Sequence, residues 1–485
     1  MNGSLVFDLT PVLPELLLAV SALTLLLLGA TREREAPQLI TPLAVIALLV
    51  TALLTLVLDK SPERTFGGHF VFDEFAAFMK VLCLIASAAS ILLATGFLRD
   101  ERIDRFEFPI LALMAALGMC AMVSANSFLG LYMALELQSL PLYVLAAFHR
   151  DQVRSTEAGL KYFVLGALAS GMMLYGCSLV YGFTGSLSFD VLAGAIGSGE
   201  GQQALSSGAV IGLVFVLAGL AFKLAAVPFH MWTPDVYEGS PTPVTAFFAA
   251  APKVAAIGLT LRLLMHPFGD SVFQWQQVIV AIAVASMLLG AFAAIGQTNI
   301  KRLMAYSGIA NIGFALVGVA AGSEKGINAV LVYMTIYVVM TLGTFGIILM
   351  MRRQGRYIET INDLAGLSRR QPLMAAALAI FMFSLAGIPP LAGFFGKLYI
   401  FVAAVDAGLA WLAVVGVLSS VVGAYYYLRL VKIAYFDEPA DAFDGNVHPS
   451  LGFVTAVAAV IILLFIVSPG PLFRAASSAA AALMR

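Results

Sequence analysis

Long apolar runs alternate with short polar connections along the whole chain. A helix needs roughly 20 mostly apolar residues to cross a bilayer, so each run of that length predicts a membrane span. We predict fourteen spans, at residues 10–30, 38–58, 74–97, 107–125, 127–148, 158–183, 208–231, 243–265, 273–295, 301–321, 327–350, 373–403, 408–434 and 450–470. The connections are too short to hold a soluble domain. The pattern therefore predicts an all-α polytopic membrane protein.

Composition agrees with this class. Of the 485 residues, 61% are hydrophobic and 11% are charged, whereas soluble domains carry about 25% charged residues. The net charge of −1 leaves no basic face for nucleic acid. Cys83, Cys120 and Cys177 lie in apolar runs without the spacing of a metal site, so we interpret them as small apolar fillers. We expect no cleaved signal peptide, because the first apolar run is a full span.

The distribution of Lys and Arg predicts an orientation, because loops rich in these residues face the cytoplasm. Odd-numbered loops and the adjoining helix ends hold sixteen of them, whereas even-numbered loops hold only Lys60, Arg64 and Lys325. We therefore predict a protein of the bacterial inner membrane with both termini on the periplasmic side. Arg474 and Arg485, near the C-terminus, run against this orientation.

Three charged residues fall near the centres of predicted spans. They are Lys223 in the seventh span, Lys253 in the eighth and Glu136 in the fifth. A charge at this depth costs about 2.5–3.5 kcal/mol on insertion scales, so such residues mark functional sites. Pro228 follows Lys223 by five residues and should break the helix. We interpret this region as the core of an ion pathway. The alternative for Glu136 is a protonated side chain bonded to a neighbouring helix.

Other polar residues in the spans have simpler interpretations. Lys80 and Arg262 lie nearer to span ends, and we expect their side chains to snorkel to the interface. Lys161 lies near the start of its span and fits a structural or a functional role equally well. We expect His230 to be an interfacial side chain, and Tyr425–Tyr427 to belong to an interfacial aromatic belt.

A second broken segment contains Pro389 and Pro390, flanked by glycines and followed by Lys397. Adjacent prolines remove two backbone donors, and the carbonyls they free need protein or water partners. The seventh and twelfth spans thus each combine a proline break with a lysine. Interrupted helices at matching positions indicate inverted repeats and their ion sites. We predict inverted five-helix repeats formed by spans 4–8 and 9–13. The corresponding segments of the chain are 1–105, 106–266, 267–436 and 437–485.

These positions suggest a chemistry. A Lys–Glu pair that opens and closes is a proton switch, because a nearby carboxylate favours the charged ammonium and burial disfavours it. Glu136 is the predicted partner of Lys223. Lys253 would link the two halves, and Lys397 would accept or pass on the proton in the second half. Four further side chains are candidates to bridge the gaps together with buried water: His230, Tyr306, Tyr333 and Tyr337.

Nothing in the sequence supplies the energy for such transport. Moving one charge against 100 mV takes about 2.3 kcal/mol. The sequence has no Walker A motif, no dinucleotide-binding glycine motif, and no His or Cys pattern for haem or iron–sulfur clusters. We therefore expect no redox cofactor in this chain. A pump would need partner subunits, whereas an exchanger would use the gradient of a second ion.

Two segments match known signature loops. Segment 228–246 reads PFHMWTPDVYEGSPTPVTA and segment 384–394 reads SLAGIPPLAGF. Both resemble loops of the antiporter-like subunits of respiratory complex I, which are shared with Mrp-type cation/proton antiporters and membrane-bound hydrogenases. The resemblance extends over essentially the whole chain. Segment 250–254 (AAPKV) and Lys397 look like the N type of subunit. The chain also lacks the long C-terminal lateral helix expected of the L type.

The resemblance implies a role for each matched position. Glu136 matches the fifth-helix glutamate that pairs with the pumping lysine, and Lys223 matches that lysine. Lys253 matches the connecting residue on the eighth helix, and Lys397 matches the twelfth-helix lysine. Lys161 matches a sixth-helix lysine near Glu136.

The resemblance also implies a fold, a function and partners. The fold would hold about fourteen transmembrane helices with two inverted five-helix repeats and broken helices 7 and 12. The chain would be a proton-translocating subunit of NADH–quinone oxidoreductase, a translocase without a redox centre of its own. NADH and quinone would bind to other subunits, and M-type and K-type membrane subunits would be its neighbours. The alternatives are a subunit of an Mrp-type Na⁺(K⁺)/H⁺ antiporter and a passive scaffold.

Overall fold

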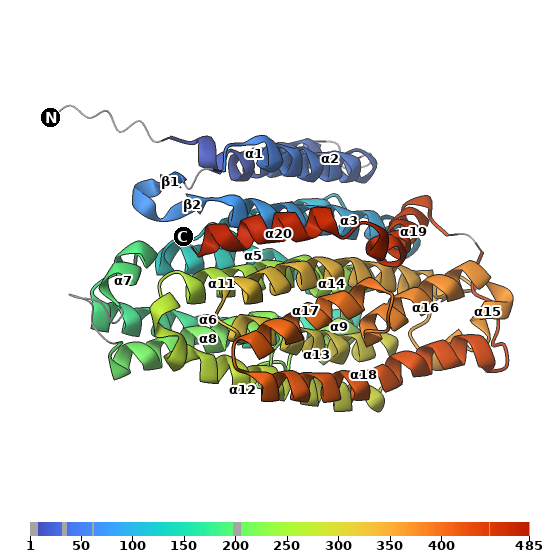
Figure 1. Cartoon of the computed structure of the whole chain (residues 1–485). Coiled ribbons are helices and arrows are strands. Elements are labelled where there is room, and N and C mark those ends of the chain that lie inside the picture. The colour runs from blue at the N-terminus through green and yellow to red at the C-terminus, as the bar shows by residue number, and fades with distance from the viewer. Residues whose placement is uncertain (1–7, 32–35, 61–62, 197–204, 446, 485) are drawn as a thin grey trace.

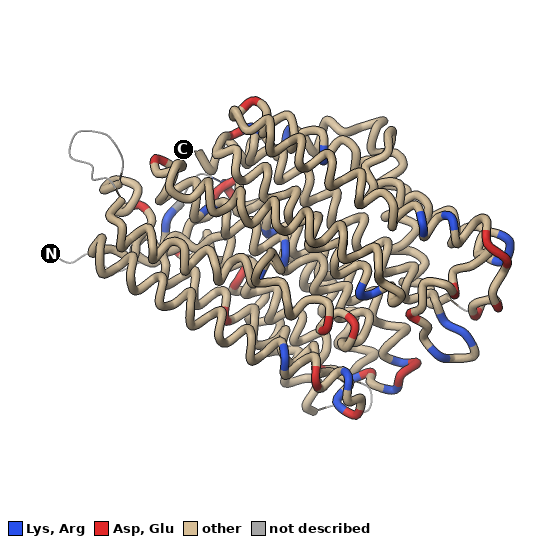
Figure 2. Tube along the Cα trace, turned by 90° about the horizontal axis from the view of Figure 1, so that it is seen from below, with Lys and Arg blue, Asp and Glu red and all other residues tan. Residues whose placement is uncertain are grey.

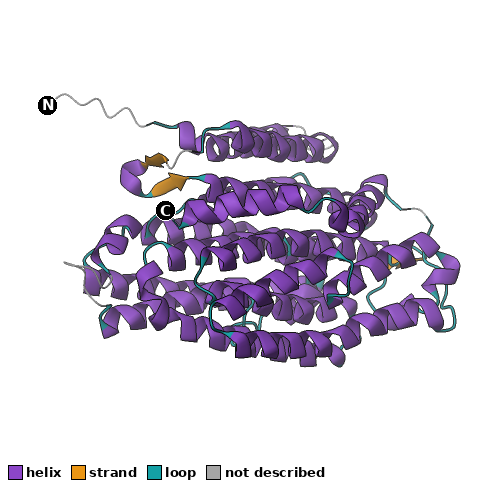
Figure 3. Cartoon of the chain, in the orientation of Figure 1, coloured by secondary structure: helices purple, strands orange, loops and turns teal. Residues whose placement is uncertain are grey.

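The computed structural model describes residues 8–31, 36–60, 63–196, 205–445 and 447–484. In this part of the chain twelve helices are long and apolar enough to cross a membrane, and two shorter apolar helices, Glu107–Val123 and Pro372–Ala386, complete the set of fourteen predicted spans. Helices form nearly the whole molecule (Figure 3), so the predicted all-α polytopic fold is confirmed.

The helices follow one another in chain order with short connections. Their bounds are α1 (Leu13–Thr31), α2 (Ala36–Val57), α3 (Glu74–Asp100), α4 (Glu107–Val123), α5 (Phe128–Ala146), α6 (Val153–Thr184), α7 (Phe189–Ala195), α8 (Ser207–Leu224), α9 (Thr233–Gly239), α10 (Thr242–Ala249), α11 (Ala251–Met265), α12 (Val272–Ile295), α13 (Ile300–Ala320), α14 (Glu324–Met350), α15 (Leu367–Arg370), α16 (Pro372–Ala386), α17 (Ala392–Asp406), α18 (Ala410–Phe436), α19 (Pro449–Leu464) and α20 (Gly470–Leu483).

Two short antiparallel hairpins lie at opposite ends of the helices. Strands β1 (Glu63–Thr65) and β2 (Phe70–Phe72) connect α2 to α3, at the end where the chain terminates (Figure 1). Strands β3 (Arg352–Arg353) and β4 (Arg356–Tyr357) follow α14 at the other end. Many charged residues lie toward the ends of the helices, and some lie within the bundle (Figure 2).

The helices form layers. In Figure 1, α1 and α2 form the outer layer at one edge, α3 and α20 lie next to it, and α12 and α18 lie at the opposite edge. The interior consists of α10, α11, α13 and α14: the α10–α11 span is 100% buried, and α13 and α14 are 94% and 89% buried. Interior helices contact other helices on every side, so polar groups on them are shielded from lipid.

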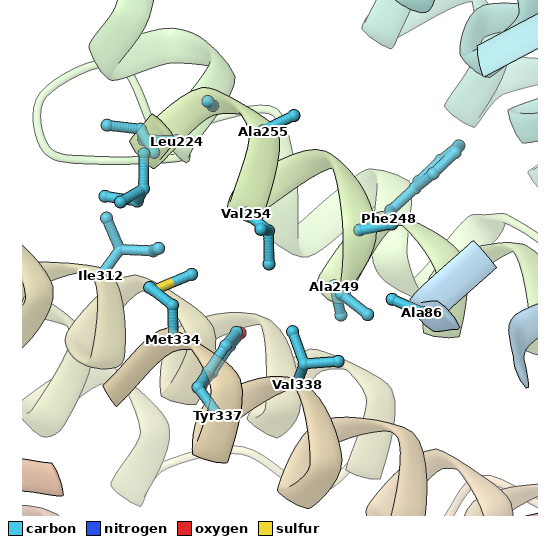
Figure 4. Close-up of a cluster of buried hydrophobic side chains, with 14 of the residues drawn as sticks. Ala86, Leu224, Phe248, Ala249, Val254, Ala255, Ile312, Met334, Tyr337 and Val338 are labelled. Carbon is cyan, nitrogen blue, oxygen red and sulfur yellow. The ribbon is translucent and has the colours of Figure 1, made fainter. Parts of the chain in front are cut away.

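A dense apolar cluster joins the interior helices. Ala249 of α10 and Val254 of α11 face Val338 and Met334 of α14, and Ala86 of α3 lies beside Ala249 (Figure 4). All these side chains are buried. Because such cores are packed closely, the cluster fixes how α10, α11 and α14 lie against one another. These helices carry Lys253 and the polar residues near it.

Both predicted breaks are present and are closed by the same backbone motif. Helix α8 ends at Leu224, where Ala225 has a φ of 61°, and α16 ends before Gly387, which has a φ of 84°. In each case the next amide donates to a carbonyl five residues earlier: Ala226 to Ala221, and Ile388 to Phe383. This is the pattern of a Schellman motif. The predicted seventh span, 208–231, was therefore too long, because its helix stops at the turn.

A third break lies in the predicted eighth span. Helices α10 and α11 meet at Ala250, whose φ and ψ of −108° and −91° are not helical. Pro252 occupies the first turn of α11, where a missing N–H is tolerated. Lys253 therefore lies in the first turn of a helix, and not in the middle of one as the continuous apolar run suggested.

The predicted final span, 450–470, corresponds to Pro449–Val467. The residues after it form a further helix, α20, which packs against α3 and α14 and runs to the end that holds β1 and β2 (Figure 1). The predicted repeats, spans 4–8 and 9–13, stay a prediction, as do the segments 1–105 and 437–485 outside them.

Candidate functional site

Lys223 lies in the last turn of α8, directly before the break. Its side chain is buried, and its Nζ donates to Ser139 Oγ at 2.7 Å and to Tyr143 Oη at 3.3 Å, both on α5. The ammonium also lies 5.4 Å from the centre of the Tyr143 ring. Two hydroxyl groups and an aromatic face therefore stabilise the charge of Lys223 in this structure.

Glu136 does not pair with Lys223 in this structure. Among the described residues no Lys or Arg nitrogen lies within 4.0 Å of its carboxylate, and its buried Oε1 has no hydrogen-bond partner. Glu136 is, however, one helical turn from Ser139, and the two side chains share a face of α5. The predicted Lys223–Glu136 pair is therefore not formed in this structure, in which Lys223 bonds instead to Ser139, one turn away on α5.

Lys253 is buried without a hydrogen-bond partner for its Nζ among the described residues. The ammonium lies 5.6 Å from the ring centre of Tyr237 and 5.9 Å from that of Tyr337. The backbone of α13 comes close here, since a Cβ at Gly308 would be 2.6 Å from Lys253 Nζ. Lys253 thus occupies an aromatic pocket at the centre of the bundle, and Tyr337 adjoins it as predicted.

Lys397 reaches back to the second break. Its Nζ donates to the carbonyl of Leu385 at 2.8 Å and to Ser420 Oγ on α18 at 2.9 Å. The ring of Phe314 lies 4.7 Å from the ammonium. The last carbonyls of a helix carry partial negative charge and lack intrahelical donors. The break in α16–α17 therefore supplies the acceptors that hold the buried lysine.

A buried polar network lies between Lys253 and Lys397. The Tyr333 hydroxyl donates to Asn311 Oδ1 at 2.7 Å, Asn311 Nδ2 donates to Tyr427 Oη at 3.2 Å, and Tyr427 bonds to Ser307 Oγ at 2.5 Å. Ser307 adjoins Gly308, which faces Lys253. At the other end, a Cβ at Gly396, next to Lys397, would lie 3.0 Å from the Tyr333 ring. Among the described residues, the network therefore lies between neighbours of the two lysines and makes no hydrogen bond to either ammonium.

The prediction for Tyr425–Tyr427 was wrong for two of its three members. Tyr425 is exposed, as an interfacial residue should be, but Tyr426 and Tyr427 are buried. Three consecutive helical residues point in different directions, about 100° apart, so the helix buries two rings and exposes one. Tyr306 and His230 are both partly exposed, and neither donates to or accepts from the three buried lysines within the described part of the chain.

Lys161 lies in an ion network at the ends of α6 and α9. Its Nζ lies 2.7 Å from Glu157 and 2.9 Å from Asp235, and Arg302 pairs with Asp235 at 2.8 Å. Burial alone would raise the pKa of Asp235, but hydrogen bonds from Lys161 and Arg302 lower it below the usual range. The side chain of Lys161 is 41% exposed, and its ion pairs are with these two acids and not with Glu136.

Lys80 and Arg262 do not snorkel. Lys80 is fully buried and pairs with Glu15 at 2.8 Å. Arg262 is buried and binds both carboxylate oxygens of Asp73, at 2.8 and 3.0 Å. The prediction failed because both acids come from elements whose position against these residues cannot be read from the sequence.

Four residues of the site were missed by sequence analysis: Ser139, Tyr143 and Ser420, which contact the lysines, and Asn311, which belongs to the polar network. Three of them carried a signal in the sequence. Ser139 and Tyr143 follow Glu136 by three and seven residues, which places all three on one helix face. Asn311 was visible as an amide within an apolar span, and such residues are costly in a membrane. Ser420 is a small hydroxyl residue with no local signal.

The chain matches one protein family and is similar to curated proteins over nearly its whole length. The family described as "NADH:quinone oxidoreductase/Mrp antiporter, TM" matches residues 125–423. NADH-quinone oxidoreductase subunit N of Parvibaculum lavamentivorans is 58% identical over 482 residues, which cover 99% of both chains. The same subunit of Methylobacterium nodulans is 58% identical over 98% of both chains.

Solved structures share the fold. A chain of respiratory complex I from Thermus thermophilus is 34% identical, with a TM-score of 0.82 over 96% of this chain and 100% of that one. A chain of the Mrp complex from Dietzia is 25% identical, with a TM-score of 0.83 over 98% of both chains. The architecture is therefore common to a chain of respiratory complex I and to a chain of an Mrp complex.

Proposed function

Because the chain belongs to the subunit N family of the bacterial NADH-quinone oxidoreductases, we propose that it carries protons across the membrane along Glu136, Lys223, Lys253 and Lys397. One observation carries the proposal. The three lysines are buried in membrane-spanning segments, and among the described residues none has a carboxylate within 4.0 Å of its ammonium. A chain that needed these lysines only for packing would pair or replace them, because buried unpaired charge is costly.

The surroundings of each lysine fit reversible protonation. A buried ammonium holds its proton more tightly when a carboxylate is near and less tightly when it is removed. Glu136 and Ser139 offer Lys223 two alternative partners one turn apart on α5. Movement of Lys223 from one to the other would change how tightly it holds its proton. Lys161 belongs to an exposed ion network, so we do not propose that it switches between partners as Lys223 does. We propose instead that it lies at the entrance of the proton path, at the end of the molecule where α6 begins.

The polar network provides the second half of the path. Proton transfer between Lys253 and Lys397 requires groups that both donate and accept, and hydroxyl groups do both. Tyr333, Tyr427 and Ser307 supply such groups, and the amide of Asn311 joins them. The tyrosines and the serine are thus proposed as proton relays together with water.

The energy for transport is proposed to come from other subunits. Transfer of one charge against 100 mV needs about 2.3 kcal/mol, and lysines and hydroxyls supply none of it. NADH oxidation and quinone reduction, in neighbouring subunits of the complex, would drive the separation and approach of Lys223 and Glu136. M-type and K-type membrane subunits are the proposed neighbours, and no redox cofactor is proposed in this chain.

The second candidate is exchange of Na⁺ or K⁺ for protons. It is favoured by the similarity to the Dietzia Mrp chain over nearly its whole length. Exchange would make proton movement depend on the second cation. A proton pump driven by electron transfer would work equally well when choline replaces Na⁺ and K⁺ in the medium.

Replacement of Lys223 by Ala tests the proposal. Quinone-reductase turnover and proton uptake would be measured together in sealed inverted vesicles that contain the assembled complex. Loss of a positioned proton carrier should reduce proton uptake by roughly 100-fold. Lys325→Ala is the matched control, because this lysine is 77% exposed at a helix end. Normal proton uptake by an assembled Lys223→Ala complex would contradict the proposal.

A further inference from the structure

Gly308 of α13 faces the ammonium of Lys253 in the interior of the molecule. A Cβ at this position would lie 2.6 Å from Lys253 Nζ and 3.3 Å from Tyr337 Oη, and the next nearest atom is Lys253 Cε at 4.0 Å. All three are side-chain atoms of residues in or beside the proposed proton path. Because Gly308 has no side chain, the ammonium and a tyrosine hydroxyl share the space in front of it.

Close packing between helices does not account for this glycine. Gly313 of the same helix and Gly290 of α12 each lie against the backbone of the neighbouring helix, where a Cβ would be 2.8 Å from Met287 N and 2.6 Å from Ala310 N, respectively. Those glycines let α12 and α13 approach each other. At Gly308, among the described residues, no backbone atom of another helix is one of the three nearest neighbours of a Cβ. Alanine, the better helix former, would fit there if the ammonium and the hydroxyl lay elsewhere.

The position of the ammonium depends on this space. Among the described residues, Lys253 Nζ has no hydrogen-bond partner, and the buried hydroxyl of Tyr237 has none either. The ammonium lies 5.6 Å from the ring centre of Tyr237 and 5.9 Å from that of Tyr337. An aromatic ring attracts an ammonium without the directionality of a hydrogen bond. What the ammonium packs against, two rings and Gly308, therefore sets where it lies.

We propose that Gly308 is a positioning residue for proton exchange at Lys253, because its missing side chain lets the ammonium lie beside the Tyr337 hydroxyl. The inference rests on the proposed function of Lys253. Gly308 also follows Ser307, a member of the polar network, so the ammonium lies against the stretch of α13 that contributes to this network. Exchange breaks one N–H bond for each O–H bond that forms, and it moves no electrons.

A methyl group at this position would displace the ammonium and leave the helices in place. Non-bonded heavy atoms pack best at about 3.5–4.0 Å, so Lys253 Nζ, at 2.6 Å from the new Cβ, would withdraw by roughly 1 Å. The end of a lysine side chain moves easily, whereas a helix backbone does not. A misplacement of about 1 Å can slow a positioned reaction by about 100-fold. The substitution should therefore slow proton transfer without disturbing the fold.

Gly308→Ala in the assembled complex tests the proposal. We expect proton uptake by sealed inverted vesicles to fall by roughly 10- to 100-fold. The dissociation temperature of the complex should not fall, because alanine favours the helix. Gly258→Ala in α11 is the matched control, since its Cβ would be 2.8 Å from Met79 Cε, also the end of a flexible side chain, and 3.0 Å from Val123 Cγ1. Its proton uptake should be that of the wild type. Wild-type uptake by Gly308→Ala, or equal losses in both variants, would overturn the proposal.

A solvent isotope effect separates slowed proton transfer from a general packing defect. If proton exchange at Lys253 limits the rate, turnover of Gly308→Ala should slow more in D₂O than turnover of the wild type or of Gly258→Ala. A packing defect would lower turnover by the same factor in both solvents, and that result would overturn the proposal.

Tyr337→Phe keeps the proposal testable if Gly308→Ala does not assemble. This variant removes the hydroxyl that shares the space and adds no atoms, so we expect reduced proton uptake. Normal uptake by Tyr337→Phe would overturn the proposal. Loss of uptake in Lys223→Ala together with normal uptake in Gly308→Ala would leave the proposed function standing and remove only the role of Gly308, whereas normal uptake in both would contradict the two proposals together.

Discussion

At the residue scale, the site is defined by what its lysines contact. Lys223 binds two hydroxyl groups, Lys253 faces two tyrosine rings, and Lys397 binds helix-end carbonyls and a serine. All of these partners are neutral. A neutral polar partner tolerates both the charged and the uncharged amine, whereas a carboxylate would hold the proton in place. Neutral partners are therefore suited to lysines that must both gain and lose a proton.

Glu136 is the one carboxylate in the proposed path. Its substitution separates the effect of side-chain charge from the effect of side-chain size. Glu136→Gln keeps the shape of the side chain but removes the negative charge that can draw Lys223 away from Ser139. We expect reduced proton uptake and turnover, and a milder effect of Glu136→Asp, in inverted vesicles. Glu324→Gln, at an exposed carboxylate, is the control. Wild-type behaviour of both Glu136 variants would remove this residue from the mechanism.

The polar network makes a second prediction at this scale. Tyr427→Phe removes the hydroxyl that joins Ser307 to Asn311, at a stability cost of about 1–3 kcal/mol for the unsatisfied partners. Tyr425→Phe is a matched control on the same helix, since the Tyr425 ring is 58% exposed. We expect the ratio of protons to electrons to fall only in the Tyr427 variant. An equal ratio in both would show that the network carries no protons.

At the scale of elements, function depends on interrupted helices. The turn after α8 places Lys223 in the last turn of a helix, and the break between α10 and α11 places Lys253 in the first turn of one. The break after α16 leaves helix-end carbonyls that accept from Lys397. Irregular backbone at membrane depth is tolerated where protein or water satisfies it. Each lysine thus lies at a point where the chain departs from a regular helix.

The Schellman motif at the second break can be tested with one methyl group. Gly387→Ala should cost about 1–2 kcal/mol, because its φ of 84° disfavours side chains. The new Cβ would also lie 3.2 Å from Lys397 Cδ. Gly182→Ala in α6, with open space around it, should gain about 0.5–1 kcal/mol in helix stability. Thermal dissociation of the purified complex measures both, and equal stability of the two variants would contradict the account.

At the scale of the whole molecule, sequence analysis predicted the features that depend on residues close together in the chain. Fourteen apolar segments, two proline breaks and the depth of three charged residues follow from hydrophobicity and backbone chemistry. It failed where residues meet from distant parts of the chain. The partners of Lys80 and Arg262 are Glu15 and Asp73, 65 and 189 residues away in sequence. The separation of Lys223 from Glu136 depends equally on how α5 and α8 pack.

The layered arrangement of the helices places the polar residues of the site in the interior of the molecule. The most buried helices, α10, α11, α13 and α14, hold Lys253 and the network residues Ser307, Asn311 and Tyr333, and Tyr427 of α18 completes the network. The helices with the most exposed faces, such as α2, α6 and α18, surround them. Placing the polar residues in the interior shields them from lipid, and the surrounding helices can face lipid or the other subunits of the complex.

Substitution of Lys253 tests the central claim most directly, that these lysines change protonation state during transport. Lys253→Arg keeps a positive charge at the centre of the bundle but holds its proton throughout, and Lys253→Met removes the charge. Protons translocated per electron would be measured for both in assembled complexes. We predict that both variants lose translocation. Wild-type translocation by Lys253→Arg would show that a fixed charge is sufficient, and would contradict the account.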